Sequence, residues 1–106
     1  DEAHRMILHR RLAEATSVKE VNALRRELTD RYGRPPAAVL RLLRLTELRV
    51  LAAQKSLGRI ETREQKIYFY KLRERTPLLV HGRLPVLKGK DATQRLDALF
   101  QALQAL

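Results

Sequence analysis

The spacing of apolar residues predicts two amphipathic helices in the first third of the chain. The first covers residues 2–15, and the second begins after Ser17 and ends at Gly33. Apolar residues recur every three or four positions in both segments: Leu8, Leu12 and Ala15, then Val21, Leu24, Leu28 and Tyr32. Ser17 and Glu20 have the spacing of a capping box. Gly33 supplies a residue that adopts positive φ easily after the last helical turn.

A third helix is predicted over residues 36–57, and it is the most apolar element. Pro36 fits the first helical position, and Gly58 is expected to end the helix. One continuous apolar stripe contains Val39, Leu43, Thr46, Val50, Ala53 and Leu57, with Leu40 and Leu51 on one side and Leu45, Leu48 and Ala52 on the other. A helix that is apolar around most of its circumference is normally covered by several neighbours. We therefore expect it to form the centre of the core.

The pattern then changes from helical spacing to alternation. Residues 59–63 and 66–72 predict two strands, and residues 78–81 and 84–87 predict two short ones, the last confined to a sheet edge by Pro85. The turn at Glu64 and Gln65 lacks the usual glycine or asparagine, which leaves its type open. A last helix begins at Asp91 and carries Leu96, Leu99, Phe100, Leu103 and Leu106. Three helices, a small antiparallel sheet and a C-terminal helix make an α+β fold. Residues 1–106 are expected to form a single domain.

Composition narrows the possible functions. The 106 residues contain no cysteine, which excludes disulfides and thiolate chemistry, and no apolar run is long enough for a membrane span. Because the chain begins at Asp1 and carries no signal peptide, we expect a piece of a longer cytoplasmic protein. The net charge is +10, and residues 58–90, with nine basic and three acidic side chains, contribute +6 of it. This excess of positive charge is compatible with nucleic acid as a partner.

No motif indicates catalysis. The first four residues spell DEAH, but no strand precedes them and the four glycines form no phosphate-binding loop. His4 and His9 are five positions apart, which is not the spacing of a helical metal site, and His81 lies far from both. We expect no enzymatic activity, no metal and no cofactor in this chain.

Aromatic and basic residues alternate in and around the second predicted strand. The candidate nucleic-acid face contains Arg59, Arg63, Lys66, Tyr68, Tyr70, Lys71 and Arg73. Tyrosine rings on a strand can stack on bases while flanking cations hold phosphates. The strand lacks the internal glycines of the common single-stranded RNA module. In the alternative interpretation, Ile67 and Phe69 pack on helices and the tyrosines form cross-strand pairs.

Residues 8–70 resemble the C-terminal domain of the bacterial transcription-repair coupling factors, the Mfd family. The matching positions are Arg11, Leu12 and Ala13; Glu27, Leu28, Asp30, Arg31, Tyr32, Gly33 and Pro36; Leu48 and Arg49; and Leu57 and Gly58. The junction after the second helix is the strongest part of the match. His9 and Pro35 depart from the family pattern, and the chain is too short for the helix that the family commonly inserts after the second strand.

The resemblance implies a regulatory domain of an ATP-driven DNA translocase that acts on stalled RNA polymerase and recruits UvrA. Such a domain would dock on the UvrA-binding module of its own full-length chain until polymerase is engaged. Carried over from the family, the partner-binding residues are Glu27 and Asp30, together with Arg31. An acid in the last helical turn faces the negative end of the helix dipole, so Asp30 is unfavourably placed unless something pairs with it. Two simpler pairings remain open, Glu27 with Arg31 and Asp30 with Arg26.

Overall fold

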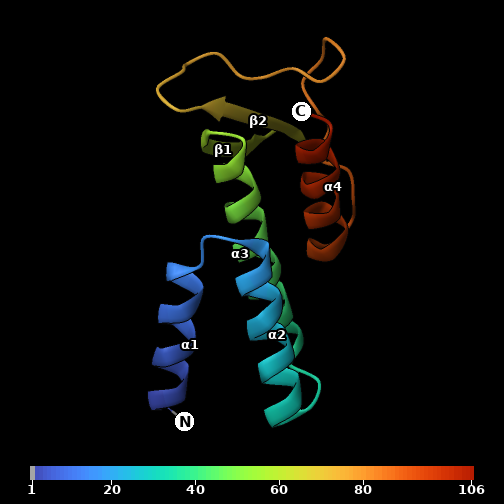
Figure 1. Ribbon diagram of the computed structural model, residues 1–106. Helices are drawn as coiled ribbons and strands as arrows, with labels where there is room; N and C mark the ends of the chain where they lie inside the picture. Colours follow the sequence, from blue (N-terminus) through green and yellow to red (C-terminus); the bar gives the residue numbers. More distant parts are fainter. Residues whose placement is uncertain (1) are drawn as a thin grey trace. The chain divides into compact units, whose positions relative to one another are not determined.

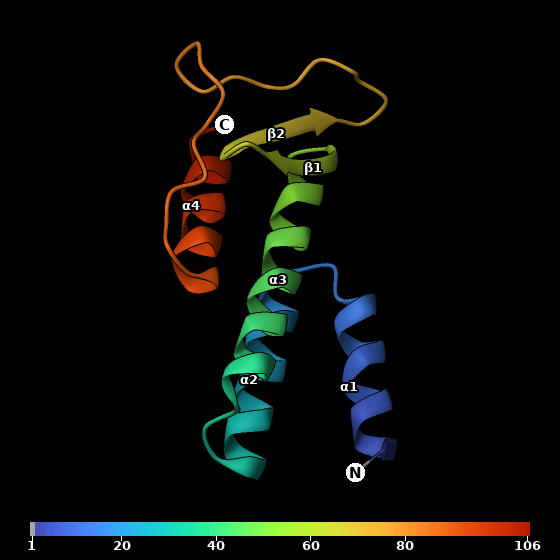
Figure 2. The same cartoon turned by 180° about the vertical axis from the view of Figure 1, so that it is seen from behind.

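A computed structural model describes residues 2–106, so Asp1 of the DEAH string lies outside the described residues. The elements are α1 (Glu2–Glu14), α2 (Val18–Tyr32), α3 (Ala37–Gln54), β1 (Leu57–Arg63), β2 (Lys66–Lys71) and α4 (Ala92–Gln104). Figures 1 and 2 show these elements from opposite sides. The predicted α+β class is confirmed. The chain divides into two compact units, residues 1–51 and 52–106. No helix among the described residues has the length and apolarity needed to cross a membrane.

The ends of α2 follow the predicted capping signals. Ser17 is extended at the N-cap, and its side chain accepts a hydrogen bond from the Glu20 N–H at 3.1 Å. The Glu20 carboxylate accepts from the N–H of Thr16, one residue before the cap. At the other end, Gly33 has φ 79° and ψ −162°, and its N–H donates to Thr29 at 2.9 Å. Positive φ is confirmed, although ψ is extended, a combination that only glycine adopts readily.

The core of the first unit joins α1, α2 and α3. Its buried members are Leu12, Ala15, Val21, Leu24, Leu43 and Val50. Leu43 is completely buried, as expected for the apolar stripe of α3. Thr46, also on that stripe, satisfies its buried hydroxyl by donating to the Leu42 carbonyl at 2.9 Å. The stripe therefore packs as predicted at these positions.

Arg49 ties α3 to the end of α1. Its Nη2 atom donates to the carbonyl oxygens of Leu12 and Ala15, each at 2.9 Å. These carbonyls belong to the last helical turn and the residue that follows it, where the regular pattern of helix hydrogen bonds ends and only a long contact of 3.4 Å from the Ala15 N–H reaches Leu12. A cation there also complements the negative end of the helix dipole.

α3 is shorter than predicted, and Gly58 does not end it. The helix stops at Gln54, and Ser56 takes φ 60° before β1 starts at Leu57. Gly58 instead lies within β1 beside Leu72, whose Cα would be 3.2 Å from an added Cβ. Pairing of Leu57 with Lys71 pulls this segment into the sheet. The position of Gly58 in the sequence does not show that this segment pairs with a strand 14 residues further on.

The second unit contains a two-stranded antiparallel hairpin. Arg63 pairs with Lys66 across a two-residue turn, in which Glu64 and Gln65 have φ 49° and 64°. Positive φ at both central positions is typical of a type I′ turn, whose twist matches that of the strands. The turn type left open by the sequence is thereby resolved, in spite of two residues that rarely adopt this conformation.

The predicted short strands at 78–81 and 84–87 reduce to isolated bridges. Val80 bridges Arg83 around Gly82, and Val86 bridges Lys66. Pro85 contributes only its carbonyl, which accepts from the Ile67 N–H at 2.9 Å. A proline cannot donate to a ladder, which keeps this segment from extending the sheet. Among the described residues no helix lies between β2 and α4.

α4 closes the chain as an amphipathic helix. Asp91 caps it by accepting from the Gln94 N–H at 2.8 Å, and the Gln94 side chain accepts from the Lys90 N–H. Its buried residues are Leu96, Phe100 and Leu103, which share one face, and Ala98. The capping pair and most of the predicted stripe are confirmed, although Leu99 and Leu106 are only half-buried.

Replacing Leu43 by alanine should destabilise the chain by about 2–5 kcal/mol, because the deletion leaves a cavity in a closed core. Chemical unfolding of the wild type and the variant measures this difference. Leu45→Ala is a matched control on the same helix, since Leu45 is exposed. An equal loss in both variants would contradict a core centred on Leu43.

Gly33→Ala and Gly33→Asn should each cost about 1–3 kcal/mol, because positive φ with extended ψ excludes side chains in general. An added Cβ would meet nothing within 4 Å, so the cost is purely conformational. Thermal unfolding of both variants tests this. Tolerance of asparagine alone would instead indicate the ordinary left-handed conformation.

Candidate functional site

The three residues implied as partner-binding lie together on the exposed side of α2. Glu27, Asp30 and Arg31 all contact solvent, and with Ala23 and Arg26 they line a shallow hollow of about 530 Å³. Their helical spacing is what gathers them, because positions three and four apart are neighbours on a helix surface. The structure thus places acids and cations of α2 on one face.

Glu27 pairs with α1 rather than with Arg31. The Arg11 Nη1 atom lies 2.7 Å from Glu27 Oε2, and the two side chains are 43% and 44% exposed. The simpler pairing of Glu27 with Arg31, which the sequence left open, is not formed. An ion pair this exposed contributes well under about 1 kcal/mol to stability. Its more definite effect is to orient the Glu27 carboxylate between two helices.

Asp30 and Arg31 have no such restraint. Within residues 2–106, neither side chain has an ion pair or a hydrogen bond to another residue. Arg26, four positions before Asp30, does not pair with it, so the second simple pairing is not formed either. An exposed carboxylate in the last turn of α2 and the neighbouring guanidinium are both available to an external partner.

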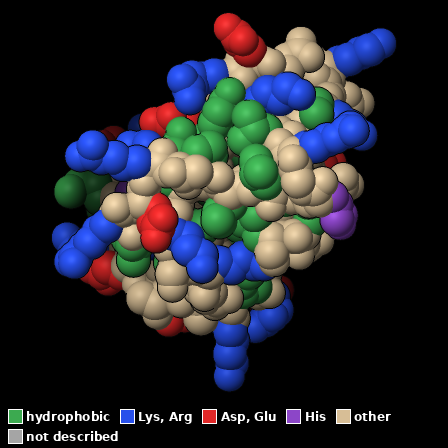
Figure 3. All heavy atoms as spheres, turned by 90° about the horizontal axis from the view of Figure 1, so that it is seen from above, with side chains coloured by type: hydrophobic (Ala, Val, Ile, Leu, Met, Phe, Trp, Pro, Cys, Tyr) green, Lys and Arg blue, Asp and Glu red, His purple; other side chains and the backbone are tan. Residues whose placement is uncertain are grey.

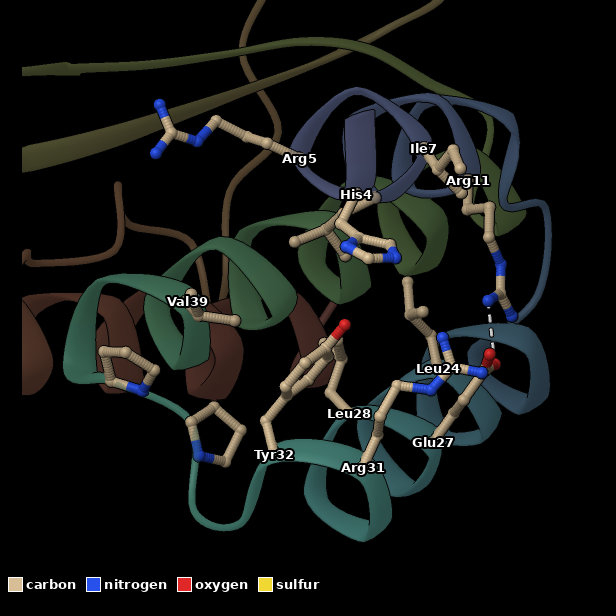
Figure 4. Close-up of a pocket in the computed structure, with 13 residues that line it drawn as sticks. His4, Arg5, Ile7, Arg11, Leu24, Glu27, Leu28, Arg31, Tyr32 and Val39 are labelled. Carbon is tan, nitrogen blue, oxygen red and sulfur yellow. Dashed lines mark hydrogen bonds and ion pairs between the residues drawn. The ribbon is translucent and has the colours of Figure 1, made fainter. Parts of the chain in front are cut away.

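A deeper groove lies on the other side of Glu27 and Arg31. It has a volume of about 600 Å³ and runs between α1, α2 and the start of α3. Figure 4 shows Leu24, Leu28 and Val39 facing it, with Tyr32 and Arg31 at its edge. Its complete lining is His4, Arg5, Ile7, Leu8, Arg11, Leu24, Glu27, Leu28, Arg31, Tyr32, Pro35, Pro36 and Val39. Glu27 and Arg31 therefore separate an apolar groove from a charged hollow.

The sequence did not identify the contribution of α1 to this site. Arg11 appears in the family pattern, but no local signal shows that its guanidinium reaches Glu27, 16 positions away. Ile7 is 53% exposed, although an isoleucine in a helix is normally assigned to the core. A large exposed aliphatic residue becomes informative only once the packing of α1 is known.

The candidate nucleic-acid face has its aromatic rings covered. The Arg59 guanidinium lies over the Tyr70 ring at 4.1 Å, and that of Arg63 lies over Tyr68 at 4.3 Å. Tyr70 is only 6% exposed. Such cation–π contacts occupy the ring faces on which a base would stack. Glu61 also lies within this face and pairs with Arg59 at 3.2 Å.

Lys71 and Arg73 are separated from the rest of that face. Lys66, Tyr68 and Tyr70 alternate onto one side of β2, whereas Lys71 has the opposite parity and Arg73 follows the strand at φ 64°. Ile67 and Phe69 are completely buried, as the simpler interpretation expected. The structure therefore brings together five of the seven predicted residues, in an arrangement unsuited to base stacking.

No group of three or more metal-binding side chains comes together within residues 2–106. His4 lies at the groove with its ring 6.5 Å from that of Tyr32, edge to face, whereas His81 is exposed in the second unit.

Comparison with known proteins identifies the family. The family model for the TRCF domain matches residues 1–78. The chain is 39% identical over 61 residues to the transcription-repair-coupling factor of Haemophilus influenzae, which is 58% of this chain and 5% of that protein. It therefore spans only a small part of the length of that curated relative. No solved structure matches the chain. Because the family match includes α1 to α3 and the whole hairpin, this chain belongs to the TRCF domain family.

Proposed function

We propose that this chain is a non-catalytic, autoinhibitory interaction domain of a transcription-repair coupling factor. It masks the UvrA-binding module of the same full-length protein until RNA polymerase is engaged, and so controls access of UvrA. The family membership and the relative named above support a role in coupled repair. In that setting the ATP-driven DNA translocation belongs to other parts of the full-length protein.

The unpaired Asp30 carboxylate is the observation that carries the proposal. It lies beside Glu27 on an exposed helix face, and nothing within residues 2–106 neutralises it. A helix end disfavours an acid at that position, and an arginine on a partner would remove the penalty. Arg31, next in the chain, provides the matching cation for an acid on the same partner. This alternation of charges favours one orientation of docking.

The local charge of the first helices also allows this basic chain to dock on an arginine-bearing module. The chain as a whole is strongly basic, but residues 1–32 contain seven basic and six acidic side chains. Long-range repulsion is therefore weaker over this segment than over residues 33–90, and contact attraction to an arginine-bearing module can dominate at short distance. The groove beside Glu27 adds a mostly apolar surface to the same interface.

Asp30→Lys should weaken docking on the separately expressed UvrA-binding module and increase UvrA capture by the full-length protein. A loss well under about 1 kcal/mol would place the contact at the rim, whereas about 2–5 kcal/mol would indicate a desolvated pair. Calorimetric titration measures the docking. Stability should rise slightly, by up to about 1 kcal/mol, because lysine suits the negative end of the helix dipole and Asp30 has no partner to lose within the described residues.

Two further variants make this test specific. Glu14→Lys changes the same charge at an exposed acid of α1 outside both the hollow and the groove, so it controls for net charge. Glu27→Lys is less clean, because it also breaks the contact with Arg11. Equal docking and equal UvrA capture by wild type and Asp30→Lys would contradict the proposal.

Binding of DNA through the strand face is the competing function, and the covered tyrosine rings argue against it. We expect the chain to bind a single-stranded oligonucleotide weakly at about 0.15 M salt, with no effect of Tyr70→Leu. Fluorescence anisotropy across a salt series measures this. Sub-micromolar affinity that falls steeply with salt and depends on Tyr70 would support the competing function.

A further inference from the structure

The two edges of the β-hairpin differ in whether their backbone groups are used. The returning chain runs along the β2 side of the hairpin and makes three backbone hydrogen bonds with it. Ile67 donates to Pro85 at 2.9 Å, the Phe69 carbonyl accepts from Leu78 at 2.8 Å, and Leu87 donates to Gln65 at 2.8 Å. Within residues 2–106, no segment bridges to the outer edge of β1. β1 is therefore an open edge of seven residues.

The register identifies which groups on that edge are open. Across a two-residue turn, Arg63 and Lys66 form a hydrogen-bonded pair, and such pairs alternate with pairs that direct their backbone groups outward. Ile67 and Phe69 do point outward on β2, as their contacts with the returning chain show. Their partners in the register are Thr62 and Ile60. The N–H and C=O groups of these two residues therefore face away from β2.

Cationic side chains flank these open backbone groups. Arg59 and Arg63 lie on either side of Ile60 and Thr62 in sequence, and each guanidinium is held against a tyrosine ring of β2. Because both rings belong to β2, each guanidinium leans away from the open edge and has to swing off its ring to meet a carboxylate of an added strand. Arginine edge residues protect a strand against random pairing, and they also select a strand of opposite charge.

The charge of the second unit decides the kind of occupant. Residues 58–90 contain nine basic and three acidic side chains, and Figure 3 shows Lys and Arg side chains surrounding apolar ones. A second copy of this chain would bring two charges of +10 together, which long-range repulsion disfavours. DNA would use the tyrosine ring faces for stacking, and the guanidinium groups of Arg59 and Arg63 cover them. An extended acidic segment needs no free ring face, because it pairs through its backbone, and Arg63, which has no acidic partner on the strand, is the cation best placed for its carboxylates.

We propose that the open edge of β1 binds an extended acidic segment of a partner protein by strand addition. The segment pairs its backbone with Ile60 and Thr62 and places carboxylates opposite Arg59 and Arg63. Strand addition draws affinity from main-chain hydrogen bonds and specificity from alternate side chains. This surface is distinct from the α2 surface of the proposed function, so either can fail without the other.

The probe is a fluorescein-labelled peptide of alternating glutamate and valine, about nine residues long to span the strand. Its counterpart replaces every glutamate by glutamine. Thr62→Pro in the full 106-residue chain removes one outward N–H without removing a hydrogen bond between β1 and β2. Thr62→Val keeps that N–H and is the matched control. Binding is followed by anisotropy, and amide exchange is followed at Ile60 and Thr62.

Thr62→Pro should weaken binding of the glutamate peptide about tenfold or more, whereas Thr62→Val should leave it unchanged. The glutamine peptide should bind more weakly than the glutamate peptide, and exchange at Ile60 and Thr62 should slow in the complex. If Thr62→Pro fails to fold by circular dichroism, Arg63→Gln decides. This substitution should weaken binding of the glutamate peptide and leave binding of the glutamine peptide unchanged.

Three results would overturn the proposal. The first is that folded Thr62→Pro binds the glutamate peptide as tightly as the wild type does, or that Arg63→Gln does so. The second is wild-type self-association in sedimentation that Thr62→Pro abolishes, which would make a second copy the occupant. The third is a single-stranded oligonucleotide that binds more tightly than the peptide and competes with it.

Discussion

The hydrogen bonds from Arg49 to the end of α1 are the contact on which the docking surface depends. α1 has a weak apolar stripe, and its large residues Met6 and Ile7 are 60% and 53% exposed. Burial of Leu12 and Ala15 anchors only its C-terminal part. Arg49 of α3 donates to two carbonyls at that same end and fixes the helix there. From this point, α1 carries Arg11 to Glu27 and forms one wall of the apolar groove.

The two proposed surfaces use charge in opposite ways. On α2, isolated acids in a nearly balanced segment attract cations in spite of the basic chain. On β1, arginines held by tyrosines work with the general positive field and attract acids. In both cases some charges have no partner of opposite sign nearby. Asp30 has no ion pair within the described residues, and Glu61 pairs with Arg59 but not with Arg63. A partner therefore gains from short-range pairing, which also fixes its orientation.

The hairpin shows how non-local pairing overrides local preference. Glu64 and Gln65 take positive φ in a turn that usually contains glycine or asparagine. Burial of Ile67 and Phe69, with the returning chain along β2, holds the register that imposes this turn. The same returning chain makes three backbone hydrogen bonds to the β2 side of the hairpin, and no segment among the described residues bridges to the outer edge of β1.

The sequence by itself determined the order and type of the elements, because helical spacing, alternation and capping pairs are local signals. The burial of Leu43 and the caps at Ser17 and Asp91 followed directly from them. The helical spacing in the sequence also placed Glu27, Asp30 and Arg31 on one helix face, and the resemblance to the family identified them as candidate partner-binding residues. Only the tertiary structure decided that Arg11 pairs with Glu27, that Arg59 and Arg63 cover the tyrosines, and which strand edge stays open. Those outcomes depend on contacts between residues far apart in the chain, and a local pattern contains no information about which distant groups will meet.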